Sequence, residues 1–64
     1  MSKLELNGKY IINAIELDEG IFRQGTQIIE CLAKSTTKYL LLFEESNDRI
    51  WLPFEREIQI MEEL

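Results

Sequence analysis

Residues 4–12 read LELNGKYII, and this stretch decides the fold class of the chain. An Asn-Gly pair stands between an alternating run and a run of aliphatic and aromatic residues, which is the strongest short-range signal for a β-hairpin. A type I′ turn needs positive φ at both central residues, and Asn and Gly tolerate that conformation best. The stretch predicts a short strand at Leu4–Leu6, a turn at Asn7-Gly8 and a long strand over Lys9–Leu17. We expect the short first strand at an edge of the sheet, as a loose flap or as the strand through which two copies meet.

The rest of the chain continues in short segments rich in β-branched, aliphatic and aromatic residues, separated by polar or glycine-containing stretches. Four further strands are predicted, at Thr26–Lys34, Lys38–Glu45, Arg49–Leu52 and Ile58–Met61. The predicted connections are a turn at Asp18–Gly20, a loop at Ile21–Gly25 and turns at Ser35–Thr37, Glu45–Asp48 and Phe54–Glu57, with fraying or one helical turn at Glu62–Leu64.

Residues 26–34 leave a helix open as an alternative to a strand. Ile28, Cys31 and Leu32 also fit the period of a helix. The Thr and Ile content of the segment and the polar turn that follows it favour a strand. Within that strand Cys31 lies in an apolar stretch, which predicts a buried, unreactive thiol.

The segment Lys9–Leu17 carries apolar residues on both of its faces, with Tyr10 and Ile12 on one and Ile11 and Ile15 on the other. This pattern is typical of a strongly curved strand that serves two sides of a barrel. With the number of short strands, it predicts an all-β fold. We expect one domain over residues 1–64, built as a small antiparallel barrel of five to six strands.

The order of the segments resembles that of the SH3-like small barrels, a group that includes SH3, Tudor and KOW-type domains. The resemblance is carried by a long first strand, a loop ending in Gly25, a central antiparallel pair, and Trp51–Phe54 leading through a tight turn to a last strand at Ile58–Ile60. It implies an SH3-like barrel with a 3₁₀ turn near Pro53. It carries over no binding residues, because the acidic and aromatic set of peptide-binding SH3 domains and the basic pattern of KOW domains are not present.

Composition excludes several kinds of chemistry. The 64 residues include twelve acidic and seven basic side chains, a net charge of −5, no histidine and one cysteine. Without histidine there is no imidazole base and no usual zinc spacing, and the separated glycines form no phosphate-binding loop. We therefore expect no cofactor, no metal, no enzymatic activity and no membrane association. The lone cysteine and the lack of a leader-like segment predict a cytoplasmic protein.

Aromatic and arginine side chains give the only candidate site. Trp51 has opposite parity to Ile50 and Leu52, so it faces outward if those two face the core. An exposed tryptophan is a typical interface anchor, and arginine suits carboxylates and phosphates. The alternative is that Trp51 covers an end of the barrel or packs on Tyr39. The candidate partner-binding residues are Trp51, Tyr10, Phe22, Arg23 and Arg49.

These features predict a non-enzymatic protein-interaction module that binds a partner protein through a partly apolar face around Trp51 with an acidic rim. It would act as an accessory subunit or as a small inhibitor of the kind that phages encode against host enzymes. Self-association into a homo-oligomer, through paired edge strands or the Trp51 faces, is an alternative. Binding of single-stranded nucleic acid by base stacking is a weaker one, because the few basic residues are scattered among acidic ones.

Overall fold

The structure, a computed structural model, describes residues 4–16 and 22–64, and of residues 14, 16, 22 and 23 it describes the backbone alone. Within these residues the chain forms five β-strands and no helix, so the predicted all-β class is confirmed. The predicted turn at Asp18–Gly20 lies outside the described residues. The strands are β1 (Lys9–Glu16), β2 (Phe22–Lys34), β3 (Lys38–Phe43), β4 (Asp48–Pro53) and β5 (Ile58–Glu63).

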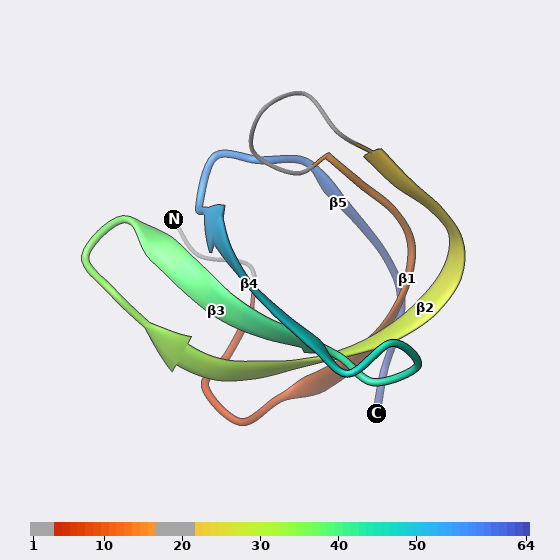
Figure 1. Cartoon of the computed structure of the whole chain (residues 1–64), viewed down its shortest axis with the longest axis horizontal. Helices are drawn as coiled ribbons and strands as arrows, with labels where there is room; N and C mark the ends of the chain where they lie inside the picture. The colour runs from red at the N-terminus through yellow and green to blue at the C-terminus, as the bar shows by residue number, and fades with distance from the viewer. Residues whose placement is uncertain (1–3, 17–21) are drawn as a thin grey trace.

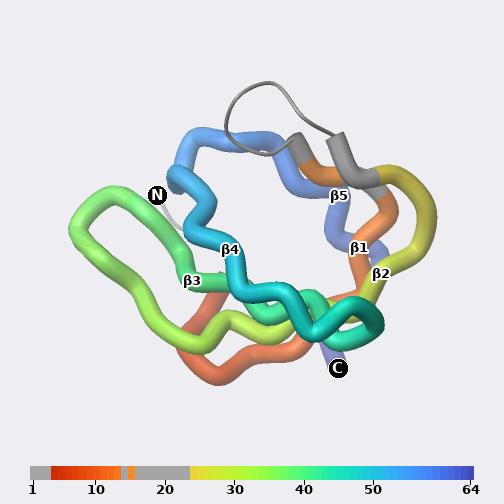
Figure 2. Tube along the Cα trace, in the orientation of Figure 1, coloured from red at the N-terminus to blue at the C-terminus, as the bar shows by residue number. Residues whose placement is uncertain are grey.

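The strands form one antiparallel sheet in the order β4-β3-β2-β1-β5 (Figure 1). The sheet is strongly curved, so that the backbone follows a ring-like path in the tube view (Figure 2). Over the described residues β4 and β5 are the two outer strands and are not hydrogen-bonded to each other. The described sheet is therefore open, and the closed barrel stays a prediction.

The predicted hairpin at Asn7-Gly8 is wrong. Asn7 has a positive φ of 66° but Gly8 does not, whereas a type I′ turn needs positive φ at two successive residues. The Gly8 N–H donates to the Glu5 carbonyl at 3.0 Å, so the turn spans residues 5–8 with Asn7 third, as in a type II turn. This turn directs Leu4 into the core and leaves Leu6 exposed. Residues 4–6 are therefore neither a strand nor an edge of the sheet.

Residues 4–8, here called the cover segment, are instead fixed onto the core by hydrogen bonds. The Asn7 N–H donates to the Cys31 carbonyl at 2.8 Å, and the Cys31 N–H donates to the Gly8 carbonyl at 3.0 Å. The Glu5 N–H donates to the Tyr10 hydroxyl at 2.8 Å, and the Leu4 N–H donates to the Tyr39 hydroxyl at 3.4 Å. The prediction of a loose flap is therefore also wrong.

Strand β2 begins at Phe22, so the predicted loop at Ile21–Gly25 is wrong over its described residues. Residues 22–24 pair with β1, and Gly25 follows them with a φ of 88°. Between the pairs Ile12–Gln27 and Ala14–Gln24 the β2 strand has one residue more than β1, which is a β-bulge. A glycine with positive φ at a bulge bends the strand, which accounts for the curvature of β2 in Figure 1.

The later strands follow the prediction closely. Residues 26–34 are strand, so the helical alternative is wrong. The turn between β3 and β4 covers residues 44–47 and ends in Asn47, whose φ of 59° is one that asparagine tolerates. The Arg56 N–H donates to the Pro53 carbonyl at 3.1 Å, which closes the predicted tight turn before β5. Residues 62 and 63 belong to β5, so the predicted fraying or helical turn there is wrong.

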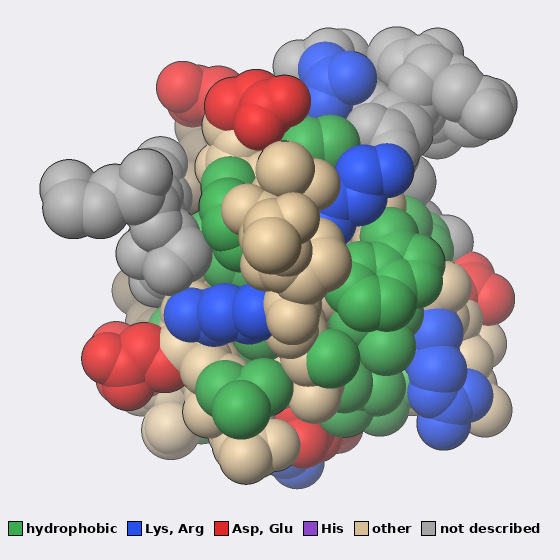
Figure 3. All heavy atoms as spheres, turned by 90° about the vertical axis from the view of Figure 1, so that its left-hand side faces the viewer, with side chains coloured by type: hydrophobic (Ala, Val, Ile, Leu, Met, Phe, Trp, Pro, Cys, Tyr) green, Lys and Arg blue, Asp and Glu red, His purple; other side chains and the backbone are tan. Residues whose placement is uncertain are grey.

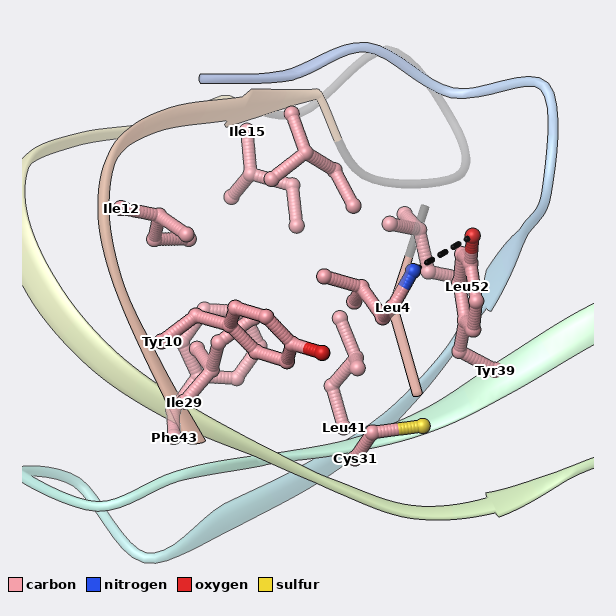
Figure 4. Close-up of a cluster of buried hydrophobic side chains, with 11 residues drawn as sticks. Leu4, Tyr10, Ile12, Ile15, Ile29, Cys31, Tyr39, Leu41, Phe43 and Leu52 are labelled. Atoms are coloured by element: carbon pink, nitrogen blue, oxygen red, sulfur yellow. Dashed lines mark hydrogen bonds between the residues drawn. The ribbon is translucent and has the colours of Figure 1, made fainter. Parts of the chain in front are cut away.

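The core fills the concave side of the sheet (Figure 4). Leu4 enters it from the cover segment, and Ile50 and Phe54 pack against its margin. The rings of Tyr39 and Phe54 meet edge-to-face with centroids 4.7 Å apart, a favoured arrangement for aromatic pairs. The buried core residues are Leu4, Tyr10, Ile12, Ile15, Ile29, Cys31, Tyr39, Leu41, Phe43, Leu52 and Ile58.

In the part of the chain that the structure describes, no helix has the length and apolar character needed to cross a membrane.

Candidate interaction surface

Trp51 lies on the convex side of the sheet, in the outer strand β4. Its neighbour Leu52 is fully buried, whereas 45% of the Trp51 surface is exposed. Trp51 pairs with Leu40 of β3, and Leu40 pairs with Ala33 of β2. Directly opposed residues of an antiparallel pair point to the same side of the sheet and contact each other. An apolar row therefore runs across three strands from Trp51 through Leu40 to Ala33.

A second row lies beside the first and carries charges. Arg49 of β4 pairs with Leu42 of β3, Leu42 pairs with Glu30 of β2, and Glu30 pairs with Lys9 of β1. The Lys9 Nζ lies 3.1 Å from the Glu44 carboxylate. The hydrogen bond to Glu44 is the main cause that raises the pKa of Lys9 above its ordinary value. We call the first three residues of the two rows together the Trp51 face: Trp51, Leu40, Ala33, Arg49, Leu42 and Glu30.

The Trp51 face offers a combination of contacts suited to another macromolecule. Hydrophobic side chains gather in one area beside lysine and arginine side chains in the space-filling view (Figure 3). Trp51 supplies a large planar surface with one N–H donor, and Arg49 supplies a planar fork of donors. The margin of the face is of mixed charge, since Arg49 and Lys9 stand there as well as Glu30 and Glu44.

Acidic side chains and the Cys31 thiol are the side chains of this chain that could bind a metal ion. Over the described ranges, 4–16 and 22–64, these side chains form no group of three or more that could hold a metal ion. The same residues include no buried polar or charged side chain.

The structure brings two of the five predicted site residues together. Trp51 and Arg49 stand two residues apart on β4, on the same side of the sheet. Tyr39, the alternative packing partner of Trp51, is fully buried on the other side of the sheet. Trp51 is thus exposed as its parity predicts, and its role as an anchor stays a prediction.

Tyr10 is one of the predicted partner-binding residues, a role that needs an exposed side chain, and the structure shows that this prediction is wrong. Only 2% of its surface is exposed, and its hydroxyl accepts the Glu5 N–H at 2.8 Å. Tyr10 pairs with the buried Ile29, whereas Ile11 pairs with Ile28, which is 40% exposed. Burying the large Tyr10 ring stabilises the fold more than burying Ile11 would. The cover segment supplies the hydrogen bond that the buried Tyr10 hydroxyl needs.

Phe22 and Arg23 lie at the start of β2, away from the Trp51 face. Their backbone pairs with Glu16 and Ile15 of β1, whereas β3 pairs with β2 only from Ile29 onward. The bulge at Gly25 separates the two ends of β2. Their side chains lie outside the description, so their binding role stays a prediction.

Cys31 is buried as predicted and contributes to the core rather than to the surface. Its surface is fully covered, and its thiol donates a long hydrogen bond of 3.7 Å to the Ala33 carbonyl. Burial raises the pKa of the thiol, although the charge of Lys34 and the Ala33 hydrogen bond act in the opposite direction. A protonated, covered thiol is a poor nucleophile.

The sequence interpretation missed the β3 and β2 members of the Trp51 face. Residues 39–43 look like one continuous apolar run, which suggests a strand buried on both sides. In the structure Tyr39, Leu41 and Phe43 are buried, while Leu40 and Leu42 are half-buried on the convex side. The available signal was the parity of Leu40 and Leu42 within a strand that the prediction already placed in an antiparallel pair.

The chain matches no protein-family model, no curated protein and no solved structure.

Proposed function

We propose that this protein is a non-enzymatic interaction module of the cytoplasm that binds a partner protein through the Trp51 face. It would act as an accessory subunit or as a small inhibitor. The observation that supports this proposal is the exposure of Trp51, 45% of its surface, in a row with Leu40 and Ala33 on the convex side of the sheet. Tryptophan and arginine are the residues most enriched among energetically dominant interface positions.

The composition of the Trp51 face favours a protein partner. A small apolar centre that is flanked by arginine, lysine and glutamate has the anatomy of a protein interface, with an apolar core and a polar rim. The net charge of −5 opposes binding to a nucleic-acid backbone. An accessory role needs only such a face, held rigid by the core behind it.

We also propose that the sheet belongs to the SH3-like barrels. Supporting features are the order β4-β3-β2-β1-β5, the bend at Gly25 and the turn closed by the Arg56 N–H and the Pro53 carbonyl before β5. Nuclear Overhauser contacts in solution between core-facing side chains of β4 and β5 would support a barrel that closes through side chains and leaves the backbone edge of β4 unpaired. Their absence in a folded sample would contradict it.

The test of the binding function is affinity capture from native cell extract with three baits: the wild-type chain, Trp51→Ala and Met61→Ala. Met61 is a matched control, because 60% of its surface is exposed and it lies on β5. We expect a protein that is retained by the wild type and by Met61→Ala and is depleted at least about tenfold with Trp51→Ala, since loss of a dominant interface residue costs about 2 kcal/mol or more.

The unfolding transition of each bait in urea shows whether loss of capture reflects loss of fold. If Trp51→Ala folds like the wild type and retains every captured protein, the Trp51 face does not bind the partner. If Trp51→Ala unfolds, Trp51→Phe replaces it, because a phenyl ring keeps most of the apolar surface and lacks the indole N–H.

A further inference from the structure

Over the described residues, the outer edge of β4 carries backbone groups that no other strand pairs with. In the described chain β4 pairs with β3 alone. The Phe54 N–H donates to the Thr37 carbonyl at 2.9 Å, and hydrogen-bonded pairs alternate along an antiparallel ladder. The non-hydrogen-bonded pairs are therefore Pro53–Lys38, Trp51–Leu40 and Arg49–Leu42. The backbone groups of their β4 members, Pro53, Trp51 and Arg49, point away from β3. Trp51 and Arg49 therefore present both an N–H and a carbonyl to an incoming strand, and Pro53 presents a carbonyl only.

We infer that a second copy of this chain adds to this edge, with β4 pairing antiparallel to β4 around a two-fold axis at Ile50. In this register Arg49 of one copy stands opposite Trp51 of the second copy. Both residues face the free edge, so each of the two symmetry-related pairs exchanges two backbone hydrogen bonds. The result is an isologous dimer with one continuous sheet across the interface.

Side-chain complementarity supports this register. Arg49 and Trp51 lie on the same convex side of β4, so each guanidinium lies beside the indole of the other copy, a favourable cation–π arrangement. Ile50 meets Ile50 of the second copy, and Asp48 stands opposite Leu52, so no like charges are opposed. Strand β4 contains one acidic and one basic residue, so the net charge of the whole chain is not concentrated at this edge.

The neighbouring register, with the axis at Trp51, fits less well. It would place Arg49 opposite Pro53 of the second copy, and proline has no N–H to donate. The carbonyl of Arg49 would remain unpaired in each half of the dimer. Pairing around Ile50 avoids this loss.

The test is the molar mass of the chain by light scattering from about 1 µM to about 1 mM, the range expected for a small interface. We expect the mass to rise from that of a 7.6 kDa chain toward twice that value. Trp51→Lys should shift this rise to at least about tenfold higher concentration, since lysine on an edge strand opposes pairing. Met61→Lys on the other outer strand, β5, should leave it unchanged.

A backbone readout distinguishes edge pairing from stacking of two Trp51 faces. Over the concentrations at which the mass doubles, the amide protons of Arg49 and Trp51 should become protected from hydrogen exchange. Arg49→Pro removes one of these N–H groups without removing a β3 hydrogen bond, and it should keep the chain monomeric.

Three results would overturn the inference. The first is a constant mass of one chain over the whole concentration range. The second is a dimer that Met61→Lys disrupts and Trp51→Lys does not. The third is a dimer in which the Arg49 and Trp51 amides stay unprotected, and this result counts even if Arg49→Pro fails to fold. A monomer that still captures a partner through Trp51 would overturn the dimer and leave the proposed function intact.

Discussion

Tyr10 joins the cover segment to the core of the protein. Its ring is buried, and its hydroxyl accepts the Glu5 N–H at 2.8 Å. The ring lies so close to Gly8 that a Cβ there would be 2.6 Å from the hydroxyl oxygen. Gly8 is therefore needed for space, not for a special backbone conformation, since its φ is not positive.

Gly8→Ala tests this close approach. The added methyl group must displace a buried ring that also holds a hydrogen bond, so we expect a loss of about 1–3 kcal/mol in the free energy of unfolding, the usual cost of overpacking. Urea denaturation followed by circular dichroism measures it. In a Tyr10→Leu background Gly8→Ala should cost less than it does in the wild type, because the ring that the methyl group must displace is absent. A Gly8→Ala variant as stable as the wild type would contradict this packing.

Cys31 gives a prediction about pH. Burial is the main cause that raises the pKa of its thiol from the ordinary value of 9.0, so the folded state favours the neutral form. Above pH 9 the thiol of the unfolded chain loses its proton while that of the folded chain keeps it, and folding stability therefore falls as pH rises. Urea titrations at pH 7, 9 and 10 should show this fall and should show less of it in Cys31→Ala. An equal fall in both chains would contradict this contribution.

At the scale of elements, one turn residue and one bulge residue determine the path of the backbone. Asn7 closes the turn of the cover segment, and Gly25 bends β2 at its bulge. Both residues are visible in the sequence as turn formers. Their effect was not predictable from local pattern, because a bulge changes which face later residues occupy. A separate bulge lies on β1, which has one residue more than β5 between the pairs Ile12–Ile60 and Ile15–Ile58. Tyr10 and Ile12 before it face the core, and so does Ile15 after it, which has the other parity.

Gly25→Ala tests the bulge. A Cβ at Gly25 would meet nothing within 4 Å, but the φ of 88° is strained for a residue with a side chain. We expect a loss of about 1–2 kcal/mol in the free energy of unfolding. Gly25→Asn should lose less than Gly25→Ala, because asparagine tolerates positive φ better. Equal losses for the two variants would show that the backbone conformation is not the cause.

The sequence predicted the later strands well and the first hairpin badly, for a physical reason. Strands β3, β4 and β5 are bounded by local turn signals. Residues 4–8 depend on distant partners instead, since Leu4 needs Tyr39 and Asn7 needs Cys31. Such contacts cannot be inferred from the spacing of neighbouring residues. The Asn-Gly pair therefore predicted a hairpin, whereas contacts with the core fix residues 4–8 as the cover segment.

At the scale of the whole molecule, the two sides of the described sheet differ in what they carry. The concave side and the cover segment enclose the core, and the convex side carries the Trp51 face. Parity alone placed Trp51 outside, because β4 has no bulge against β3. Parity alone placed Tyr10 wrongly, because the pairing of β1 with β2 decides which side of β1 faces the core.

The central claim is that Trp51 is exposed in the free chain and becomes covered by the partner. Trp51 is the single tryptophan of the sequence, so its fluorescence reports on this position alone. The measurement is the emission maximum of Trp51 and the quenching of its fluorescence by acrylamide in a dilute, monomeric sample. Both are recorded before and after the captured partner is added. If the partner contains tryptophan, a tryptophan-free version of the partner is used. We predict accessible, long-wavelength emission in the free chain, and a shift to shorter wavelength with weaker quenching on binding. Emission that is already protected in the free chain, or that stays unchanged while the complex forms, would contradict the claim.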